Sequence, residues 1–176
     1  MPKVILYISC SLDGYLAGPE NDLSFLEKVH IAGEDYGYTT FVDGVDSVIV
    51  GRKTYQWVID QGFEYPHADK ETYIITRNTR ESEGKRHFYT GDLKQLVAEL
   101  KNRGSKDIYC DGGAEIVNLM LKQKLIDEII LSVVPVILGD GTPLFKNGLP
   151  KSELTLLNSQ SYASGLVQLH YQINQS

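Results

Sequence analysis

Short apolar runs recur along the chain, and most of them end at glycine or at polar residues. Five runs are rich in β-branched or aromatic side chains and alternate little between apolar and polar positions: residues 4–10, 47–50, 72–76, 108–110 and 129–134. Such runs are typical of strands that are buried on both faces of a sheet. A weaker run at residues 87–89 predicts one further short strand.

The segments between these runs repeat apolar residues every three or four positions, which predicts amphipathic helices. The clearest helix covers residues 93–103, with Asp92 at its N-cap and Gly104 at its end. A second helix begins after Gly113, and its apolar pattern continues to Ile126.

The last part of the chain has a different pattern. Residues 166–173 alternate apolar and polar side chains, which is typical of a half-exposed antiparallel strand. We expect residues 154–161 to pair with it through a turn at 162–165. Because the earlier strands alternate with helices, the whole pattern predicts an α/β fold in one domain over residues 1–176, with a terminal hairpin.

Composition and charge narrow the classes of function. The net charge of −6 argues against a nucleic-acid partner, which would need a basic face. The sequence has no run of about 18 apolar residues, so we expect no membrane span. Its two cysteines, Cys10 and Cys110, are too few for a disulfide scaffold or a zinc site. They favour a reducing, cytoplasmic setting.

Three predicted strands end in residues that suit an anionic ligand: Gly51-Arg52-Lys53-Thr54, Thr76-Arg77 and Asp111-Gly112-Gly113. Glycine lets the backbone approach a ligand, a helix N-terminus attracts anions, and arginine offers a planar fork to phosphate oxygens. Each feature has a plainer alternative, because Gly-Gly can be a simple turn and Arg52-Lys53 a solvated basic turn. Together they predict a dinucleotide with a 2′-phosphate, although the usual G-x-G-x-x-G fingerprint is absent.

Four motifs, in their order along the chain, resemble a known family. They are Ser-Leu-Asp-Gly (11–14), Val-x-Val-Gly-Arg-Lys-Thr (48–54), Asp-Gly-Gly-Ala-Glu (111–115) and Pro-Val-Ile-Leu-Gly-Asp-Gly-Thr-Pro-Leu-Phe (135–145). Nearly the whole chain is similar to the dihydrofolate reductase-like superfamily, in the branch of the C-terminal reductase domain of the riboflavin-biosynthesis protein RibD. The resemblance implies a three-layer fold with a central, mostly parallel sheet of about eight strands, an antiparallel C-terminal hairpin and helices on both faces. It also implies NADPH as the hydride donor.

The resemblance also implies which residues bind the cofactor. The phosphates would be held by Gly51, Arg52, Lys53 and Thr54, with Arg52 at the 2′-phosphate, while Thr76 and Arg77 would flank the adenosine end. The pyrophosphate would be held by Gly112, Gly113, Ala114 and Glu115, next to Asp111, which we also count as cofactor-binding. Family members join the pair at Gly112-Gly113 by a cis peptide. The nicotinamide would be lined by Ser9 and the loop 13–17, including Leu16 and Ala17.

Two aspartates are the candidates for catalysis. Asp22-Leu23-x-x-Leu26 resembles the start of the folate-reductase helix whose carboxylate faces the substrate, so Asp22 is the first candidate. Its alternative role is the N-cap of a short helix over residues 23–29. Asp13, in the loop beside the nicotinamide, is the second candidate. The Trp-x-x-Pro loop of folate reductases has no counterpart in this sequence.

We therefore expect an NADPH-dependent reductase that transfers hydride to a small heterocyclic substrate. The resemblance favours the 5-amino-6-(5-phosphoribosylamino)uracil reductase reaction of riboflavin biosynthesis. The alternatives are a dihydrofolate reductase-type activity and a catalytically silent NADP(H)-binding or sensor module. We also expect a homodimer that pairs near the tail hairpin.

The resemblance makes the strands at 4–10 and 108–110 parallel neighbours. Because Cys10 and Cys110 end these strands, we expect their Cα atoms to lie within about 10 Å of each other. Both thiols should be reduced.

Overall fold

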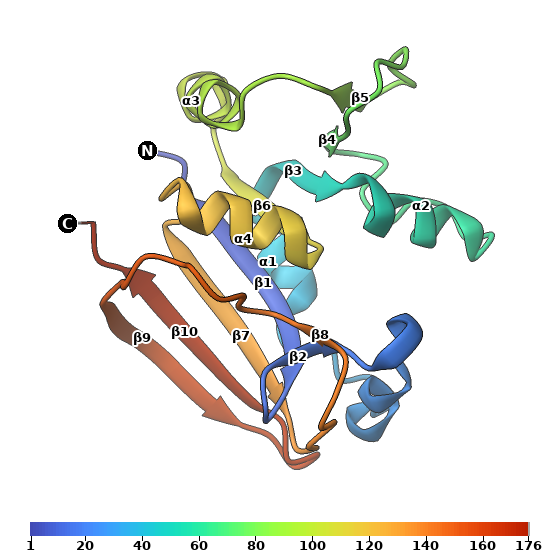
Figure 1. The fold of residues 1–176 in the computed structure, drawn as a ribbon, viewed down its shortest axis with the longest axis vertical. Helices are drawn as coiled ribbons and strands as arrows, with labels where there is room; N and C mark the ends of the chain where they lie inside the picture. Colours follow the sequence, from blue (N-terminus) through green and yellow to red (C-terminus); the bar gives the residue numbers. More distant parts are fainter. Residues whose placement is uncertain (176) are drawn as a thin grey trace.

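A computed structural model describes residues 1–175, and it is built around one eight-stranded sheet (Figure 1). The strand order is β5-β4-β3-β6-β1-β7-β10-β9. The strands are β1 (Val4–Ser11), β3 (Val45–Gly51), β4 (Glu71–Ile75), β5 (Arg86–Tyr89), β6 (Asp107–Gly112), β7 (Glu128–Val134), β9 (Leu154–Ser161) and β10 (Val167–Ile173). The first six strands in that order run parallel, and β10 and β9 form the antiparallel end. The predicted sheet and its terminal hairpin are confirmed.

Helices cover both faces of the sheet, as predicted. They are α1 (Tyr38–Asp43), α2 (Arg52–Asp60), α3 (Leu93–Arg103) and α4 (Ala114–Lys122). On one face, α3 and α4 pack on a core that includes Ile49 of β3. On the other face, Val48 of β3 meets α1 and Val50 meets α2, because alternate residues of a strand point to opposite sides. Figure 1 shows α4 in front of the sheet and α1 behind it.

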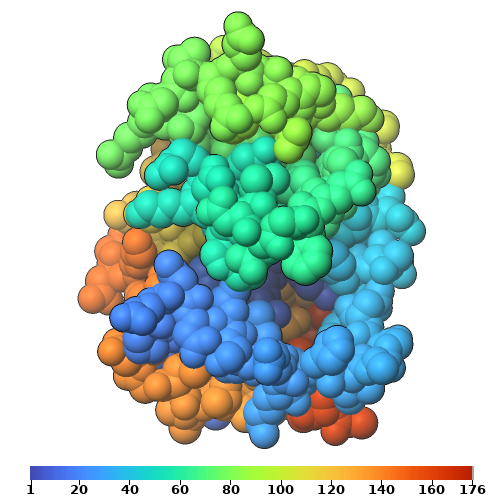
Figure 2. Space-filling view, turned by 90° about the vertical axis from the view of Figure 1, so that its right-hand side faces the viewer, coloured from blue at the N-terminus to red at the C-terminus, as the bar shows by residue number. Residues whose placement is uncertain are grey.

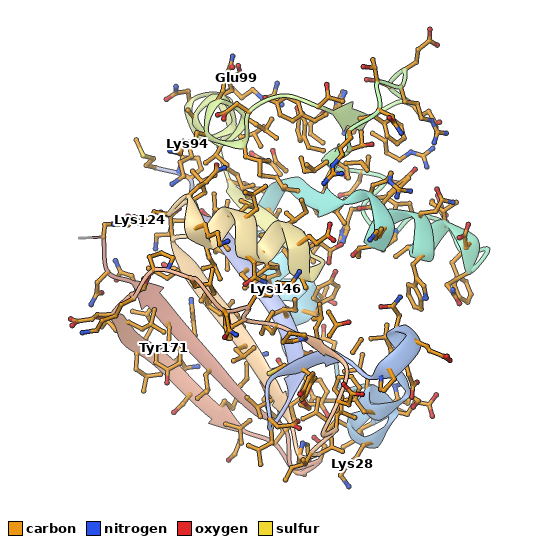
Figure 3. All side chains as sticks on the ribbon, in the orientation of Figure 1. Lys28, Lys94, Glu99, Lys124, Lys146 and Tyr171 are labelled. Atoms are coloured by element: carbon orange, nitrogen blue, oxygen red, sulfur yellow. The ribbon has the colours of Figure 1, made fainter. Side chains whose placement is uncertain are left out.

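Two helix predictions need correction. The apolar pattern placed Ile126 on the helix after Gly113, but α4 ends at Lys122, and Ile126 is a buried residue just before β7. The segment predicted as a helix over 23–29 forms a 3₁₀-helix, η2 (Ser24–Val29), which packs Phe25 and Val29 against Val134. By contrast, α3 has the predicted bounds. Its leucines are buried, and its charged residue Glu99 points away from the sheet (Figure 3).

A small second sheet fixes the loop that follows β1. Strand β2 (Tyr15–Ala17) pairs with β8 (Thr142–Pro143), close to the 3₁₀-helix η1 (Pro19–Asn21). Gly141 lies so near β2 that an added Cβ would overlap the Ala17 carbonyl oxygen. The loop after β1 is therefore held against residues 139–144, at the carboxyl end of the parallel strands.

The two cysteines lie on neighbouring strands, but not beside each other. Strands β1 and β6 pair as predicted, and their register places Cys110 opposite Leu6. Cys10 lies four residues further along β1, about 13 Å away at about 3.3 Å per residue. The expected close approach was wrong because the two strands are staggered, not because the strand order differs. Both thiols are free and buried, and burial raises the pKa of Cys10 to about 11 and of Cys110 to about 12.

Two kinds of feature are missing from the described part of the chain. None of the helices within residues 1–175 is long and apolar enough to cross a membrane. The same residues contain no group of three or more histidine, cysteine, aspartate or glutamate side chains arranged to hold a metal ion.

Candidate functional site

Two helices begin side by side at the carboxyl edge of the sheet. Gly51 ends β3 and is the N-cap of α2, while Gly113 follows β6 and is the N-cap of α4. Because β3 pairs with β6, the two helix starts are neighbours. An added Cβ on Gly113 would lie 2.8 Å from Thr54 Oγ1, and one on Gly51 would lie 3.0 Å from Ile116 Cγ1. Both glycines are thus required by the close packing of the two helix starts.

Neither helix start has a side-chain cap. Within residues 1–175, no side-chain oxygen accepts from the first-turn N–H groups of α2 or α4, whereas the side chain of Asp92 caps α3 by accepting from Gln95 N at 3.0 Å. The first N–H groups of a helix have no acceptor within the helix, and they carry the positive end of its dipole. Two such ends at one place form a site that suits an anion.

Cations surround these uncapped helix starts. Arg52 and Lys53 occupy the first turn of α2, and both are exposed. Lys53 Nζ lies 3.7 Å from Glu115 Oε1, and both side chains are mostly in solvent. Within residues 1–175, Arg52 and Arg77 make no ion pair or hydrogen bond. Their guanidinium groups are therefore free to bind a ligand, which fits the predicted phosphate groups of a dinucleotide.

The link between β6 and α4 has the backbone that the resemblance implied. The Gly112-Gly113 peptide bond is cis, as predicted. Gly112 has a φ of +100°, in the region that favours glycine, and an added Cβ there would touch Ile8 and Val117. Ala114 is buried at the start of α4 and Glu115 is exposed.

A hollow opens beside these helix starts. Figure 2 shows it between the dark-blue N-terminal segment, the lighter-blue segment that includes α1, and teal α2, with orange and red parts of the chain at its floor. Among the residues predicted to line the nicotinamide, Ser9 is half-buried on β1, and Leu16 and Ala17 lie on β2. Thr76 lies just past β4 and accepts from Asn78 N at 3.2 Å.

The two aspartates predicted to be catalytic both hold loops in place. Asp13 accepts from Ser11 Oγ at 2.6 Å and from the N–H groups of Leu138 (3.1 Å) and Gly139 (2.8 Å). Asp22 accepts from the N–H of Ser24 at 2.9 Å and from its hydroxyl at 3.0 Å. These hydrogen bonds, chiefly from Ser11 to Asp13 and from Ser24 to Asp22, lower the pKa of both carboxyl groups. Their catalytic roles remain predictions, and the contacts favour the loop-holding alternative.

Asp111 is in a different environment from these two. Its Oδ1 accepts from Tyr109 Oη at 2.8 Å, and its Oδ2 lies 3.9 Å from His67 Nε2. Burial raises the pKa of the Asp111 carboxyl, although about a quarter of the side chain (23%) is exposed. Tyr38 of α1 approaches His67 Nε2 at 3.3 Å, and Tyr7 stacks on Phe41 close by.

The sequence pattern does not predict the contacts among Tyr38, His67 and Tyr109. Alternation along the strands could have shown which of the nearby strand residues lie together, because Tyr7 and Ser9 on β1, and Tyr109 and Asp111 on β6, each share a face. His67 has no such signal, since it is a single histidine in the segment between α2 and β4.

A comparison with known protein families identifies the family of this chain. A model of the RibD C-terminal domain matches residues 65–168 of the sequence. The chain belongs to the RibD C-terminal domain family. This family fold accounts for the largely parallel sheet with its antiparallel end and for the riboflavin-pathway, reductase-like architecture.

Relatives of this RibD C-terminal domain protein match nearly its whole length. YwjB of Bacillus subtilis (strain 168) is 37% identical over 171 residues, which cover 96% of this chain and 97% of YwjB. A solved structure from Shewanella sp. PV-4, of a protein named for riboflavin biosynthesis, has a TM-score of 0.90 at 29% identity and covers 98% and 99% of the two chains.

A more distant structure shows the same fold inside a larger chain. It is the diaminohydroxyphosphoribosylaminopyrimidine deaminase/5-amino-6-(5-phosphoribosylamino)uracil reductase of Thermotoga maritima, with a TM-score of 0.73 at 13% identity. The match covers 98% of this chain and 57% of that chain.

Proposed function

We propose that the protein is an NADPH-dependent reductase, acting on a small heterocyclic substrate of the 5-amino-6-(5-phosphoribosylamino)uracil type. The observation that carries the proposal is the pair of uncapped helix starts at Gly51 and Gly113, with Arg52 beside them, in a member of the RibD C-terminal domain family. Uncapped N–H groups and a free guanidinium suit a ligand with several phosphates.

Different residues at this edge of the sheet bind different parts of the cofactor. The N–H groups of α4 hold the pyrophosphate, Arg52 and Lys53 bind the 2′-phosphate, and Thr76 and Arg77 flank the adenosine. The ring end of the cofactor would be lined by Ser9 of β1 and by Leu16 and Ala17 of β2, as the resemblance implies. When bound, the cofactor supplies a hydride, and the protein positions the reactants and keeps water out.

The substrate binds in the hollow, against a polar patch of the sheet. Gln168 Nε2 of β10 donates to Tyr7 Oη and to Ser132 Oγ, each at 3.1 Å, on the sheet face that also carries Asp111. Polar groups next to the half-buried Tyr38 suit a flat heterocycle, which can stack on this ring while its edges hydrogen-bond.

Cofactor preference and turnover test the function. We expect NADPH to bind more tightly than NADH by calorimetry, and to be oxidised when the phosphoribosylaminouracil is added. Oxidation with dihydrofolate alone would instead support the folate-reductase alternative. Tight NADPH binding with no oxidation by either substrate would support a silent NADP(H)-binding module. Failure to bind NADPH at all would overturn the proposal.

We also propose that the protein is a homodimer that pairs through its terminal hairpin. All eight residues of β9 are exposed, including Leu154, Leu156 and Leu157, and β9 is an edge strand of the sheet. An exposed apolar edge strand is usually covered by a partner. Light scattering should give twice the 19.7 kDa chain mass. A concentration-independent monomer would contradict the pairing.

A further inference from the structure

The chain has one tryptophan, and it lies on α2 with nearly half of its surface in solvent. Trp57 is 46% exposed, although tryptophan is usually well buried. Within residues 1–175, its indole ring contacts no other aromatic ring or cation, and its ring N–H donates no hydrogen bond. A single exposed apolar side chain needs no explanation by itself, so the position of Trp57 on the helix decides what it can do.

The position of Trp57 turns its ring toward the start of α4. Trp57 lies four residues after Lys53, so these two side chains share a face of α2. Lys53 Nζ is 3.7 Å from an oxygen of Glu115, in the first turn of α4. Thr54, on the adjoining side of α2, lies against Gly113. Because helical side chains lean toward the N-terminus of their helix, the indole extends back toward the two paired helix starts.

The same helix borders the hollow beside the helix starts. Figure 2 shows teal α2 above the hollow, opposite the blue segment that follows β1 and contains β2. Four residues of helix, about 6 Å, separate Trp57 from Lys53. The exposed face of α2 therefore carries a cation at the end where phosphates would bind and an apolar ring one turn further along. This order suits a ligand pair with phosphates at one end and flat, reacting rings at the other.

Other aromatic rings near this edge already have partners within the protein. Tyr7 stacks on Phe41 with ring centroids 4.8 Å apart, and Tyr55 packs edge-on against Tyr65 at 5.3 Å. The face of an aromatic ring attracts a second flat ring, and an exposed indole also removes apolar surface from water when it is covered. Trp57 thus provides, on the α2 side of the hollow, a large ring whose stacking capacity the fold itself does not use.

We propose that the indole of Trp57 stacks on the flat ring of the substrate and thereby selects the substrate class. The proposal rests on the proposed reductase function. It assigns to the hollow a planar, conjugated nitrogen heterocycle and excludes puckered or aliphatic carbonyl compounds, which offer no flat face to the indole. Stacking stabilises the bound substrate and the transition state alike, so Trp57 contributes to substrate binding and leaves the chemical step to other groups.

The first test uses tryptophan fluorescence, which reports on Trp57 alone because the chain has no second tryptophan. The protein is first saturated with NADP⁺, which cannot donate a hydride, so the measurement needs no turnover. We expect 5-amino-6-(5-phosphoribosylamino)uracil to quench the emission in a saturable way, and ribose 5-phosphate, which has no flat ring, to leave it unchanged. Free N-acetyltryptophanamide corrects for absorption by the pyrimidine. Pyrimidine binding detected by calorimetry without quenching would overturn the stacking role.

The second test separates substrate binding from chemistry in variants of Trp57. Trp57→Leu keeps an apolar side chain but removes the ring, and it should raise KM for the pyrimidine by about 5- to 100-fold, the usual effect of losing one base–aromatic stack. The value of kcat should change less than about twofold, because uniform binding is lost. Trp57→Phe keeps a ring and should recover most of the affinity. NADPH affinity should stay unchanged in both variants, since Arg52 and Lys53 remain on an intact helix.

The matched control is Phe63→Leu, because Phe63 is also an exposed aromatic residue (75%) and lies three positions past the end of α2. This variant should leave KM unchanged. An unchanged KM in Trp57→Leu, or the same rise in Phe63→Leu, would overturn the stacking role and leave the reductase function standing. Loss of NADPH affinity in Trp57→Leu equal to the loss of substrate affinity would show that the residue only supports α2, which also overturns it. Saturable quenching in a protein that oxidises no NADPH would support the stacking site and overturn the reductase function alone.

Discussion

The N-terminus of α3 differs from the N-termini of α2 and α4 in what satisfies its unpaired N–H groups. Every helix begins with N–H groups that lack a partner. In α3, Asp92 fills that need and Gly104 ends the helix, so the element is complete within the chain. In α2 and α4, glycine stands at the N-cap and no side chain fills the need. Glycine at the N-cap costs only about a few tenths of a kcal/mol relative to aspartate, and it leaves the first N–H groups of α2 and α4 available to a ligand.

The first-turn charges sharpen this contrast. The last turn of α3 carries Lys101 and Arg103, which suits the negative end of the helix dipole. In α2, by contrast, Arg52 and Lys53 sit in the first turn, against the dipole. The charges at both ends of α3 therefore stabilise its dipole, whereas those in the first turn of α2 oppose it and would favour the bound anion of the proposed function. The predictions below test this difference, beginning with the largest expected effect.

Gly113→Val should abolish NADPH binding, because the side chain projects from the start of α4 toward α2, where the cofactor phosphates would bind. The structure adds a second reason, since an added Cβ would lie 2.8 Å from Thr54 Oγ1. The two reasons separate in a Thr54→Ala background, where that close contact is relieved. Calorimetry on Gly113→Ala with Thr54→Ala, compared with Thr54→Ala alone, should still show lost binding. Equal affinity in these two variants would mean that Gly113 serves packing only.

Arg52→Ala should weaken NADPH by about 1–3 kcal/mol, the usual range for a hydrogen bond to a charged group. NADH lacks the 2′-phosphate, so its affinity should change little. Calorimetric titration of both cofactors checks this, and circular dichroism confirms that the fold is intact. An equal loss for NADPH and NADH would place Arg52 at the pyrophosphate instead.

Asp92→Ala tests the side-chain cap of α3. Removing this cap should lower the free energy of unfolding by about 1 kcal/mol, as measured in urea, and leave NADPH affinity unchanged. The affinity should be independent of the variant because α3 begins past the end of β5, and β4 separates β5 from β3, where α2 starts. A change in NADPH affinity similar to that of Arg52→Ala would show that the three helix starts are not separate in function.

The sequence predicted the parts of the fold whose signal is long and local. The longer strands, α3 and the terminal hairpin each show an apolar run or a repeat over several residues, which predicts them from the local sequence. Strands β2 and β8 have three and two residues, too few for any periodicity. The stagger of Cys10 and Cys110 depends on strand register and on irregularities such as the one between Ile49 and Val50, where β3 pairs with β6. The local pattern of apolar and polar residues does not determine strand register or such irregularities.

The candidate site also has a part that the sequence predicts and a part that it does not. Its glycines and cations were visible, because phosphate binding uses short motifs at strand ends. The contact between Asp111 and His67 was not visible, because Asp111 looks like part of the Asp-Gly-Gly motif and His67 lies 44 positions before it in the chain. Only the folded sheet brings these two side chains to 3.9 Å, with Tyr38 and Tyr109 around them.

Glu115→Gln should have the smallest effect on stability and on NADPH affinity. The variant tests how much the acidic charge at the start of α4 contributes to each. Glu115 is the acidic residue in the first turn of α4, where it favours the helix dipole, and it lies 3.7 Å from Lys53. Because both side chains are mostly exposed, loss of the pair should change the free energy of unfolding by no more than about 0.5 kcal/mol. NADPH should bind slightly more tightly, since a negative charge near the phosphates is removed and Lys53 is released. The gain should shrink at high salt, where exposed charges are screened. Titrations at low and high salt, with Glu99→Gln on α3 as the matched control, measure this. Weaker NADPH binding in Glu115→Gln would instead show that the carboxylate contacts the cofactor directly.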